Sequence, residues 1–228
     1  MVVSENQNMG KKNISQEKII QAFLTSAFAK SAGASSLADV SEILEIKKAS
    51  LYNHFDSRDD MYAATLVHCA KEVENVSFLQ EKTIETIKGG KVAPSALFKK
   101  LIIRFFELFE NEPFFAIYVF VHTEQYFNIE ALKIVEAENQ KIFDSIKELL
   151  SEFSAAGKIA KRTDKELKDI AAVISGIIIQ HRDSYIAARK EIVRQNPDCG
   201  AGSLFALPTD ETALNRTLKL VDSILKTL

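Results

Sequence analysis

Residues Lys47–Phe55 read KKASLYNHF, a mixture of side chains that does not suit an ordinary core helix. A helix turns by about 100° per residue, so Leu51 and Phe55 fall on one side of this stretch. The other positions carry small, polar or basic groups that point away from that side or flank it: Lys48, Ala49, Ser50, Tyr52, Asn53 and His54. We predict that two apolar residues anchor a short helix here and leave its outer face open to a large partner.

Two further short helices are predicted before this stretch. Apolar residues recur at helical spacing over Ile19–Phe28, which predicts a first helix beginning near Ser15. Ser36 followed by Asp39 is typical of an N-cap with an acidic first turn, which predicts a second helix over about residues 37–44. A very tight turn is then all that separates the second helix from the third.

A longer helix is predicted after the stretch. Ser57 with Asp60 three residues later repeats the Ser-x-x-acid start, which opens a fourth helix through His68 and beyond. Two short helices with a tight turn between them, the second with an exposed polar face, make the outline of a helix-turn-helix.

The segment SSLADVSEILEIKKASLYNHFDSRDDMYAATL, residues 35–66, resembles the N-terminal domain of the TetR (tetracycline-repressor-like) transcriptional regulators. The match covers about residues 15–66, and the rest of the chain is compatible with the family but carries no motif. Arg58 stands where the family pattern has a lysine. Seven residues are in register with the pattern: Val40, Ile46, Leu51, Tyr52, His54, Phe55 and Ser57.

Two positions depart from the family pattern. Glu45 replaces the glycine of the turn, so the turn either strains Glu45 at positive φ or follows another path. Lys47 replaces the serine that caps the third helix, which removes a side-chain acceptor for the first amides. Our hypothesis is that Lys47 instead contributes a phosphate contact.

Nine residues are candidates for contact with DNA: Ser36, Lys47, Lys48, Ala49, Ser50, Tyr52, Asn53, His54 and Arg58. Lysines at the start of a recognition helix neutralise phosphates, although a solvated pair of lysines is the structural alternative. Ser50 and Asn53 can hydrogen-bond base edges or phosphate, and Ala49 can touch a thymine methyl group.

The resemblance implies that Tyr52 and His54 reach the phosphate backbone, with a purely structural role as the alternative for His54. Ser36 and Arg58 lie at or beside predicted helix N-termini, where backbone amides favour a phosphate. Ser36 can also act as a cap alone. Lys11 and Lys12 precede the first helix and either follow the DNA or make no contact with it.

The remainder of the chain also has helical periodicity, and no stretch alternates with period two. A long helix is predicted over about residues 129–156, with Gly157 as its C-cap. Thr163 and Glu166 form a capping-box pair that opens another helix over about residues 164–194. We therefore predict an all-α chain with a helix-turn-helix domain at residues 1–57 and an effector-binding and dimerisation bundle at residues 58–228.

A small-molecule pocket is predicted in this bundle, because aromatic residues crowd into positions 105–127. The alternative is that these aromatics simply form the core. An apolar effector is expected, oriented by a few polar groups. The candidate ligand-binding residues are Phe105, Phe109, Tyr118, His122, Tyr126 and His181.

Composition excludes several classes of protein. The chain has 228 residues, 46% of them hydrophobic and 26% charged, with a net charge of −2, so any DNA-binding surface must come from local clustering. Two cysteines make neither a disulfide framework nor a metal site. The longest apolar runs fall short of the ~20 residues of a membrane span. A cytoplasmic protein without a cofactor is expected.

Three functions are weighed on these features. The first is a ligand-responsive regulator, most simply a homodimeric repressor released by its effector from a palindromic operator; in the family, the last two helices make the dimer interface. The second is a helical binding or adaptor protein of the same fold with degenerate DNA binding. The departures from the family pattern at Glu45 and Lys47 favour this alternative. The third, an enzyme, is not expected, since no Glu-x-x-His pair, Gly-rich loop or nucleophile elbow occurs.

Overall fold

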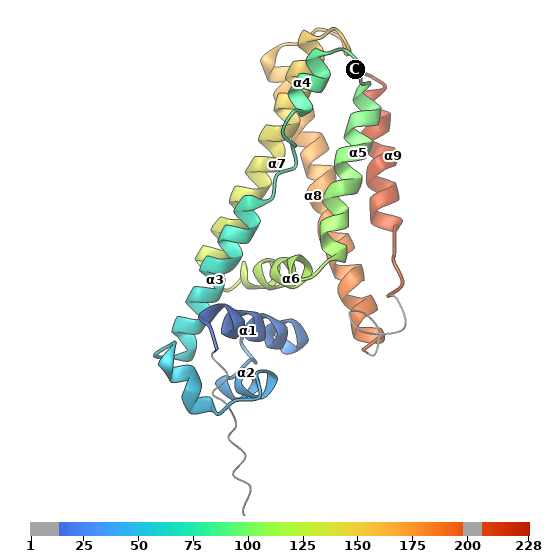
Figure 1. Cartoon of the computed structure of the whole chain (residues 1–228). Coiled ribbons are helices and arrows are strands. Elements are labelled where there is room, and N and C mark those ends of the chain that lie inside the picture. Colours follow the sequence, from blue (N-terminus) through green and yellow to red (C-terminus); the bar gives the residue numbers. More distant parts are fainter. Residues whose placement is uncertain (1–13, 198–206) are drawn as a thin grey trace, which may run out of the picture. The chain divides into compact units, whose positions relative to one another are not determined.

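The structure is a computed structural model that describes residues 14–197 and 207–228. Lys11, Lys12 and Cys199 lie outside these residues. The predicted all-α fold is confirmed, since every regular element in the described ranges is a helix (Figure 1). In chain order these are α1 (Gln16–Lys30), α2 (Leu37–Ile43), the 3₁₀ helix η1 (Lys48–Asn53), α3 (Arg58–Asn75), α4 (Thr83–Lys88), α5 (Pro94–Glu107), the 3₁₀ helix η2 (Leu108–Glu110), α6 (Phe114–Glu124), α7 (Ile129–Ala155), α8 (Asp164–Gln195) and α9 (Thr212–Leu225).

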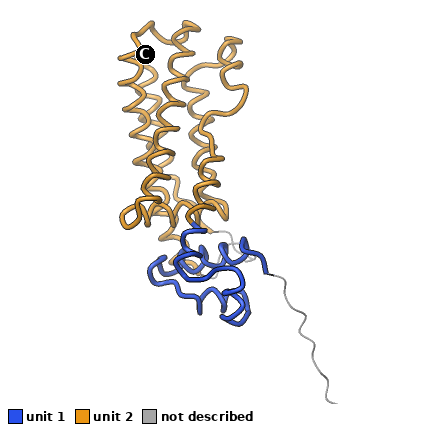
Figure 2. The backbone as a smooth tube through the Cα atoms, turned by 90° about the vertical axis from the view of Figure 1, so that its left-hand side faces the viewer, with its two compact units in different colours: residues 1–65 blue, residues 66–228 orange. Residues whose placement is uncertain are grey.

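The chain divides into two compact units, residues 1–65 and 66–228 (Figure 2). The boundary predicted from the sequence lies between residues 57 and 58. The two units instead meet between Thr65 and Leu66, inside α3. One helix is therefore shared by both units.

In the first unit, hydroxyl groups begin the helices where the sequence predicts. Ser15 Oγ accepts a 3.3 Å hydrogen bond from the Lys18 amide at the start of α1. Ser36 forms a complete capping box at the start of α2. Ser57 Oγ accepts a 3.0 Å hydrogen bond from the amide of Asp60 in the first turn of α3. Each bond satisfies an amide that has no partner inside its own helix.

The third helix differs from the expected α-helix. It is the six-residue 3₁₀ helix η1, in which the Ser50 amide donates to the Lys47 carbonyl at 2.8 Å. Glu45 takes φ 54°, so the turn follows the strained of the two predicted paths, and Lys47 provides no side-chain cap. The two predicted anchors, Leu51 and Phe55, are both buried.

In the second unit, the long helices begin and end at the predicted signals. Thr163 and Glu166 form a complete capping box at the start of α8. Gly157, at φ 65°, follows α7, and the next amide, of Lys158, donates to the carbonyl of Phe153 at 2.9 Å. This is the hydrogen-bond pattern with which a left-handed glycine ends a helix. Helix α7 packs against α8, α8 against α9, and α9 against α5, while α6 runs across their direction (Figure 1).

The end of α3 is held by two basic side chains from neighbouring helices. Lys141 on α7 donates to the carbonyls of Glu74 and Val76 at 2.6 and 3.0 Å. Arg104 on α5 donates to the carbonyl of Phe78 at 2.8 Å. The Glu74 carbonyl belongs to the last turn of α3 and has no partner within the helix, whereas Val76 and Phe78 follow the helix. The bonds therefore hold the end of α3 and the segment after it to the bundle.

Candidate nucleic-acid interface and ligand pocket

The exposed face of η1 brings together most of the residues predicted to contact DNA. Five of these side chains are exposed and two, Ser50 and His54, are partly exposed: Lys47, Lys48, Ala49, Tyr52, Asn53, Ser50 and His54. In a 3₁₀ helix, side chains three positions apart lie in the same row. The helix therefore presents one row of Ala49 and Tyr52 and a second row of Ser50 and Asn53.

These two rows supply the chemical groups that DNA recognition uses. Hydroxyl and amide groups can bond base edges, and the ammonium groups of Lys47 and Lys48 at the start of η1 can neutralise phosphates. The end of η1 is also fixed, because Gln16 Nε2 on α1 donates to the His54 carbonyl at 3.1 Å. The backbone that presents these polar side chains is therefore held by Gln16 and by the buried residues Leu51 and Phe55.

Ser36 is engaged with its own helix. Its hydroxyl accepts a 3.3 Å bond from the amide of Asp39 and donates a 2.8 Å bond to the carboxylate of the same residue. Lys30 lies 2.6 Å from that carboxylate and, with the bonds from Ser36, lowers the pKa of Asp39 to about 2. A phosphate approaching Ser36 would meet this ionised group, so the geometry favours the capping role.

Arg58 is also engaged internally. Its Nε donates a 2.8 Å hydrogen bond to the carbonyl of Ser35, and a terminal nitrogen donates to the carbonyl of Ala32. The guanidinium lies 5.7 Å from the centre of the Phe23 ring, within cation–π range. Arg58 thus ties the start of α3 to the segment between α1 and α2, and DNA contact by this side chain stays a prediction.

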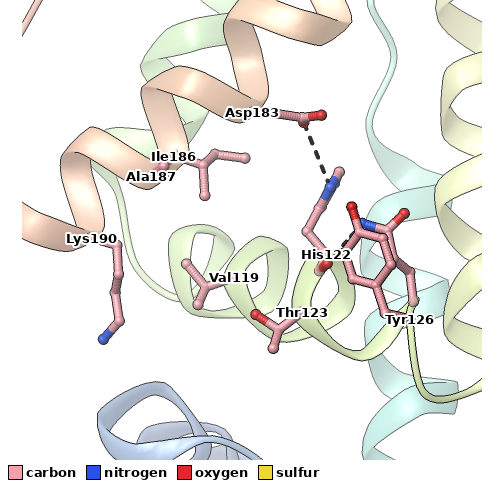
Figure 3. Close-up of a pocket in the computed structure, with 9 residues that line it drawn as sticks. Val119, His122, Thr123, Tyr126, Asp183, Ile186, Ala187 and Lys190 are labelled. Atoms are coloured by element: carbon pink, nitrogen blue, oxygen red, sulfur yellow. Dashed lines mark hydrogen bonds and ion pairs between the residues drawn. The ribbon is translucent and has the colours of Figure 1, made fainter.

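A pocket of about 250 Å³ opens between α6 and α8 (Figure 3). Two of the predicted ligand-binding residues, His122 and Tyr126, line it. The other lining residues are Val119, Thr123, Gln125, Asp183, Ile186, Ala187 and Lys190. On α8, the aliphatic residues Ile186 and Ala187 lie between the polar residues Asp183 and Lys190. The lining is therefore not uniformly apolar.

The four remaining ligand candidates lie outside this pocket's lining. Phe105 and Phe109 are buried in an aromatic cluster, with their rings 5.4 Å apart and nearly perpendicular, a favourable edge-to-face geometry. His181 on α8 is buried and lies 3.0 Å from the Thr217 hydroxyl on α9; burial, then the charge of Arg216, lowers the pKa of His181. Tyr118 belongs to a polar network behind the pocket.

That network joins α6, α7 and α8. Tyr118 donates a 2.7 Å hydrogen bond to Glu138 Oε1, and Arg182 Nη1 lies 2.9 Å from Glu138 Oε2. Arg182 Nε also donates a 3.0 Å bond to Asp183 Oδ1. His122 stands between the two carboxylates, with one ring nitrogen 3.6 Å from Glu138 and the other 3.6 Å from Asp183.

The charge states of the network follow from these contacts. Burial, followed by the neighbouring carboxylate of Glu138, raises the pKa of Tyr118 well above its ordinary value, so the phenol stays neutral. Burial also opposes ionisation of Glu138, but its contacts with His122, Arg182 and Tyr118 outweigh burial and lower the pKa of this carboxyl. Glu138 is therefore ionised at neutral pH.

Sequence reasoning missed Glu138, Arg182, Asp183 and Lys190. One signal was visible for Glu138, because it occupies a position of the apolar stripe of α7, three residues after Val135. A carboxylate at such a position must be paired when it is buried. Its partner, Arg182, lies 44 residues away in the sequence, so the pairing depends on the tertiary fold.

The described parts of the chain offer no group of three or more His, Cys, Asp or Glu side chains that could hold a metal ion. None of the helices in residues 14–197 and 207–228 is both long and apolar enough to cross a membrane.

Comparison with known proteins gives a clear likeness in fold only. The sequence matches no family model and no curated protein. Among solved structures, the chain is similar to a TetR transcription regulator from Haloarcula marismortui, with a TM-score of 0.58, 10% identity, and coverage of 93% of this chain and 97% of that chain. A transcriptional regulator from Rhodococcus sp. RHA1 has a TM-score of 0.59 and 12% identity, with coverage of 94% of this chain and 97% of that chain. A TetR transcriptional regulator from Legionella pneumophila has a TM-score of 0.53 and 15% identity, with coverage of 92% of this chain and 98% of that chain.

Proposed function

We propose that this chain, which has the fold of the TetR-family regulators, is a DNA-binding transcriptional regulator. It acts as a homodimeric repressor that a small effector releases from a palindromic operator in the cytoplasm. No enzymatic activity is part of this proposal. The observation that carries it is η1 with its flanking residues, a segment that buried Leu51 and Phe55 anchor. Its outer face exposes Lys47, Lys48, Tyr52 and Asn53.

Support for a homodimer comes from α8 and α9. Val173 on α8 and Leu220 on α9 are 56% and 39% exposed, and Gly176 leaves α8 open to close approach. Isolated exposed apolar residues are common, but these lie on the two helices that the resemblance assigns to the interface. A two-fold dimer would place two η1 helices on half-sites about 34–36 Å apart.

The α6–α8 pocket is the effector site of this proposal. An effector changes an equilibrium only by binding one conformation more tightly than another. Helix α3 belongs to both units, so it is the element through which occupation of the pocket would change the separation of the two η1 helices in the dimer.

DNA binding is tested by fluorescence anisotropy with DNA from directly upstream of the protein's own gene, at two salt concentrations. Saturable, sequence-preferring binding that weakens with salt is expected. Tyr52→Ala should weaken it strongly, whereas Phe127→Ala, which removes an exposed aromatic ring outside the pocket lining, should leave it unchanged. Weak binding that is equal for all duplexes and indifferent to Tyr52 would exclude the regulator.

The alternative is a helical binding or adaptor protein whose DNA binding is degenerate. Glu45 at φ 54° and the missing side-chain cap at Lys47 favour it, because both weaken the definition of η1. The same anisotropy experiment separates the two functions: a steep salt dependence excludes the adaptor, and non-selective weak binding supports it.

A further inference from the structure

The inner end of the α6–α8 pocket has more acidic than basic charge. Arg182 is fully buried and is the shared counter-ion of two carboxylates, Glu138 at 2.9 Å and Asp183 at 3.0 Å. Tyr118, the other group bonded to Glu138, is neutral. Arg182, Glu138 and Asp183 together therefore carry a formal net charge of −1.

Part of that charge is directed to the pocket. Every contact of the Asp183 carboxylate within the described residues is made by Oδ1, which faces Arg182 and His122. The Asp183 side chain is 52% exposed and lines the pocket, so Oδ2 remains available to a ligand. Figure 3 shows His122 pointing from α6 toward Asp183 on α8, with Tyr126 beside it.

The His122 ring makes no hydrogen bond to either carboxylate in this arrangement. Both of its contacts to carboxylates are 3.6 Å long, beyond hydrogen-bond distance, and among the described residues its buried Nε2 has no hydrogen-bond partner. The charge-bearing groups that face the ring are Glu138 from α7, and Arg182 and Asp183 from α8. A ligand that supplied the missing positive charge would therefore not have to displace a strong internal bond.

The other end of the pocket is different. Lys190 lies seven residues after Asp183 on α8, about 10 Å along the helix axis. Lys190 already interacts with the negative charge of Glu112, so it does not require an anionic ligand. Between Asp183 and Lys190 the wall is formed by Ile186 and Ala187, with Val119 opposite on α6, which suits a small apolar body.

We propose that this pocket binds a small organic ammonium compound, whose cationic nitrogen contacts Asp183 Oδ2 beside His122 and whose apolar part lies along Ile186 and Val119. The inference rests on the proposed function, because it names the chemical class of the effector. An exposed tyrosine ring, Tyr126, can add a cation–π contact at this end. Lys190 repels a second cation and so selects monocations.

A charge series of nearly equal size tests the proposal: 2-phenylethylammonium, 2-phenylethanol and 3-phenylpropanoate, titrated into the full-length protein at pH 8 and followed by ¹H–¹⁵N NMR shifts and calorimetry. The ammonium should bind about fivefold more tightly than the alcohol, as expected for one partly exposed ion pair, and the carboxylate should bind most weakly. Equal binding of ammonium and alcohol, tightest binding of the carboxylate, or no saturable binding of any probe would overturn the proposal.

Three variants locate the site. Asp183→Asn should abolish the preference for ammonium, while Asp169→Asn, which neutralises an exposed carboxylate on the same helix, should preserve it. Lys190→Met should strengthen ammonium binding. If Asp183→Asn unfolds the protein, the probe series on the unmodified chain and Lys190→Met still decide the question.

The DNA-binding measurement on the same preparation separates this inference from the proposed function. Salt-dependent operator binding without ammonium preference would refute the ligand class and leave the regulator intact. Ammonium preference without operator binding would leave the pocket's specificity standing and refute the regulator.

Discussion

The guanidinium of Arg182 lies 2.9 Å from the carboxylate of Glu138, and both side chains are buried between α7 and α8. The pair is unequal, because Arg182 also binds Asp183. Within the described residues, the other basic ion-pair partner of Glu138 is His122. Loss of either member of a buried ion pair leaves a charge without its partner, but the consequence differs for the two.

Arg182→Met should destabilise the second unit by about 3–5 kcal/mol, because it leaves two carboxylates without their counter-ion. Glu138→Gln should cost clearly less, since Arg182 keeps Asp183 and the amide still accepts a hydrogen bond from Tyr118. Urea denaturation of the two variants measures the difference. Equal losses would show that Arg182 does not serve two partners.

Arg58→Ala should lower the stability of the first unit by about 1.5–3 kcal/mol, because charged hydrogen bonds to the carbonyls of Ser35 and Ala32 are lost. Lys47→Ala, which changes an exposed cation, should leave stability unchanged and weaken DNA binding at low salt. Thermal unfolding by circular dichroism, together with anisotropy, checks both. An unchanged melting temperature for Arg58→Ala would show that these hydrogen bonds do not stabilise the first unit, and would leave DNA contact as the role of Arg58.

Asp39 should make the first unit sensitive to acid. The hydrogen bond from Lys30, followed by those from Ser36, lowers the pKa of Asp39 from 3.8 to about 2. A lowered folded-state pKa adds stability that is fully present above pH ~4 and is lost as the pH falls toward 2. Asp39→Asn should therefore be less stable than the natural sequence at pH 6, and the gap should narrow by pH 2.5. Asp59→Asn, whose carboxylate is 91% exposed, is the control in the same melting series.

Glu45→Gly should stabilise the first unit by up to about 1 kcal/mol, because glycine adopts φ 54° without the strain of a side chain. The gain should be accompanied by unchanged or tighter DNA binding if the turn already has the geometry that DNA requires. Chemical denaturation and anisotropy of the variant measure both effects. A loss of stability would mean that contacts of the Glu45 side chain outweigh the backbone strain.

Val173→Glu and Leu220→Glu should shift the protein toward the monomer, because each places a charge on the proposed α8–α9 interface. Val67→Glu is the matched control, since Val67 is 71% exposed on α3. Light scattering after size-exclusion chromatography reports the molar mass. A dimer that persists in both α8–α9 variants would place the interface elsewhere.

Signals confined to a few neighbouring residues were readable from the sequence. The caps at Ser15, Ser36, Ser57 and Thr163 depend on residues three positions away, and all four begin helices in the structure. The same holds for the anchors of η1. The local pattern did not predict the 3₁₀ geometry of η1. It also left open whether Glu45 takes a positive φ, which it does in the structure.

The ligand pocket was less accessible to sequence reasoning for a physical reason. Aromatic residues at helical spacing look the same whether they line a cavity or fill a core, and Phe105 and Phe109 fill the core. The polar groups behind the pocket come from three helices, and the bond between Glu138 and Arg182 spans 44 residues. Such an arrangement depends on the register between helices, which a single sequence does not display.

The position of α3 across the boundary of the two units decides how the protein can be divided for separate study. A fragment that stopped at Thr65 would cut the helix in the middle and remove the following turns, with the buried Cys69 and Val73. A fragment that stopped at Asn75 would keep the helix but lose Lys141 and Arg104, which bind the carbonyls at and just beyond its end. An isolated first unit should therefore extend through residue 75 and carry a substitute C-cap, such as an added glycine, in place of the two missing basic side chains.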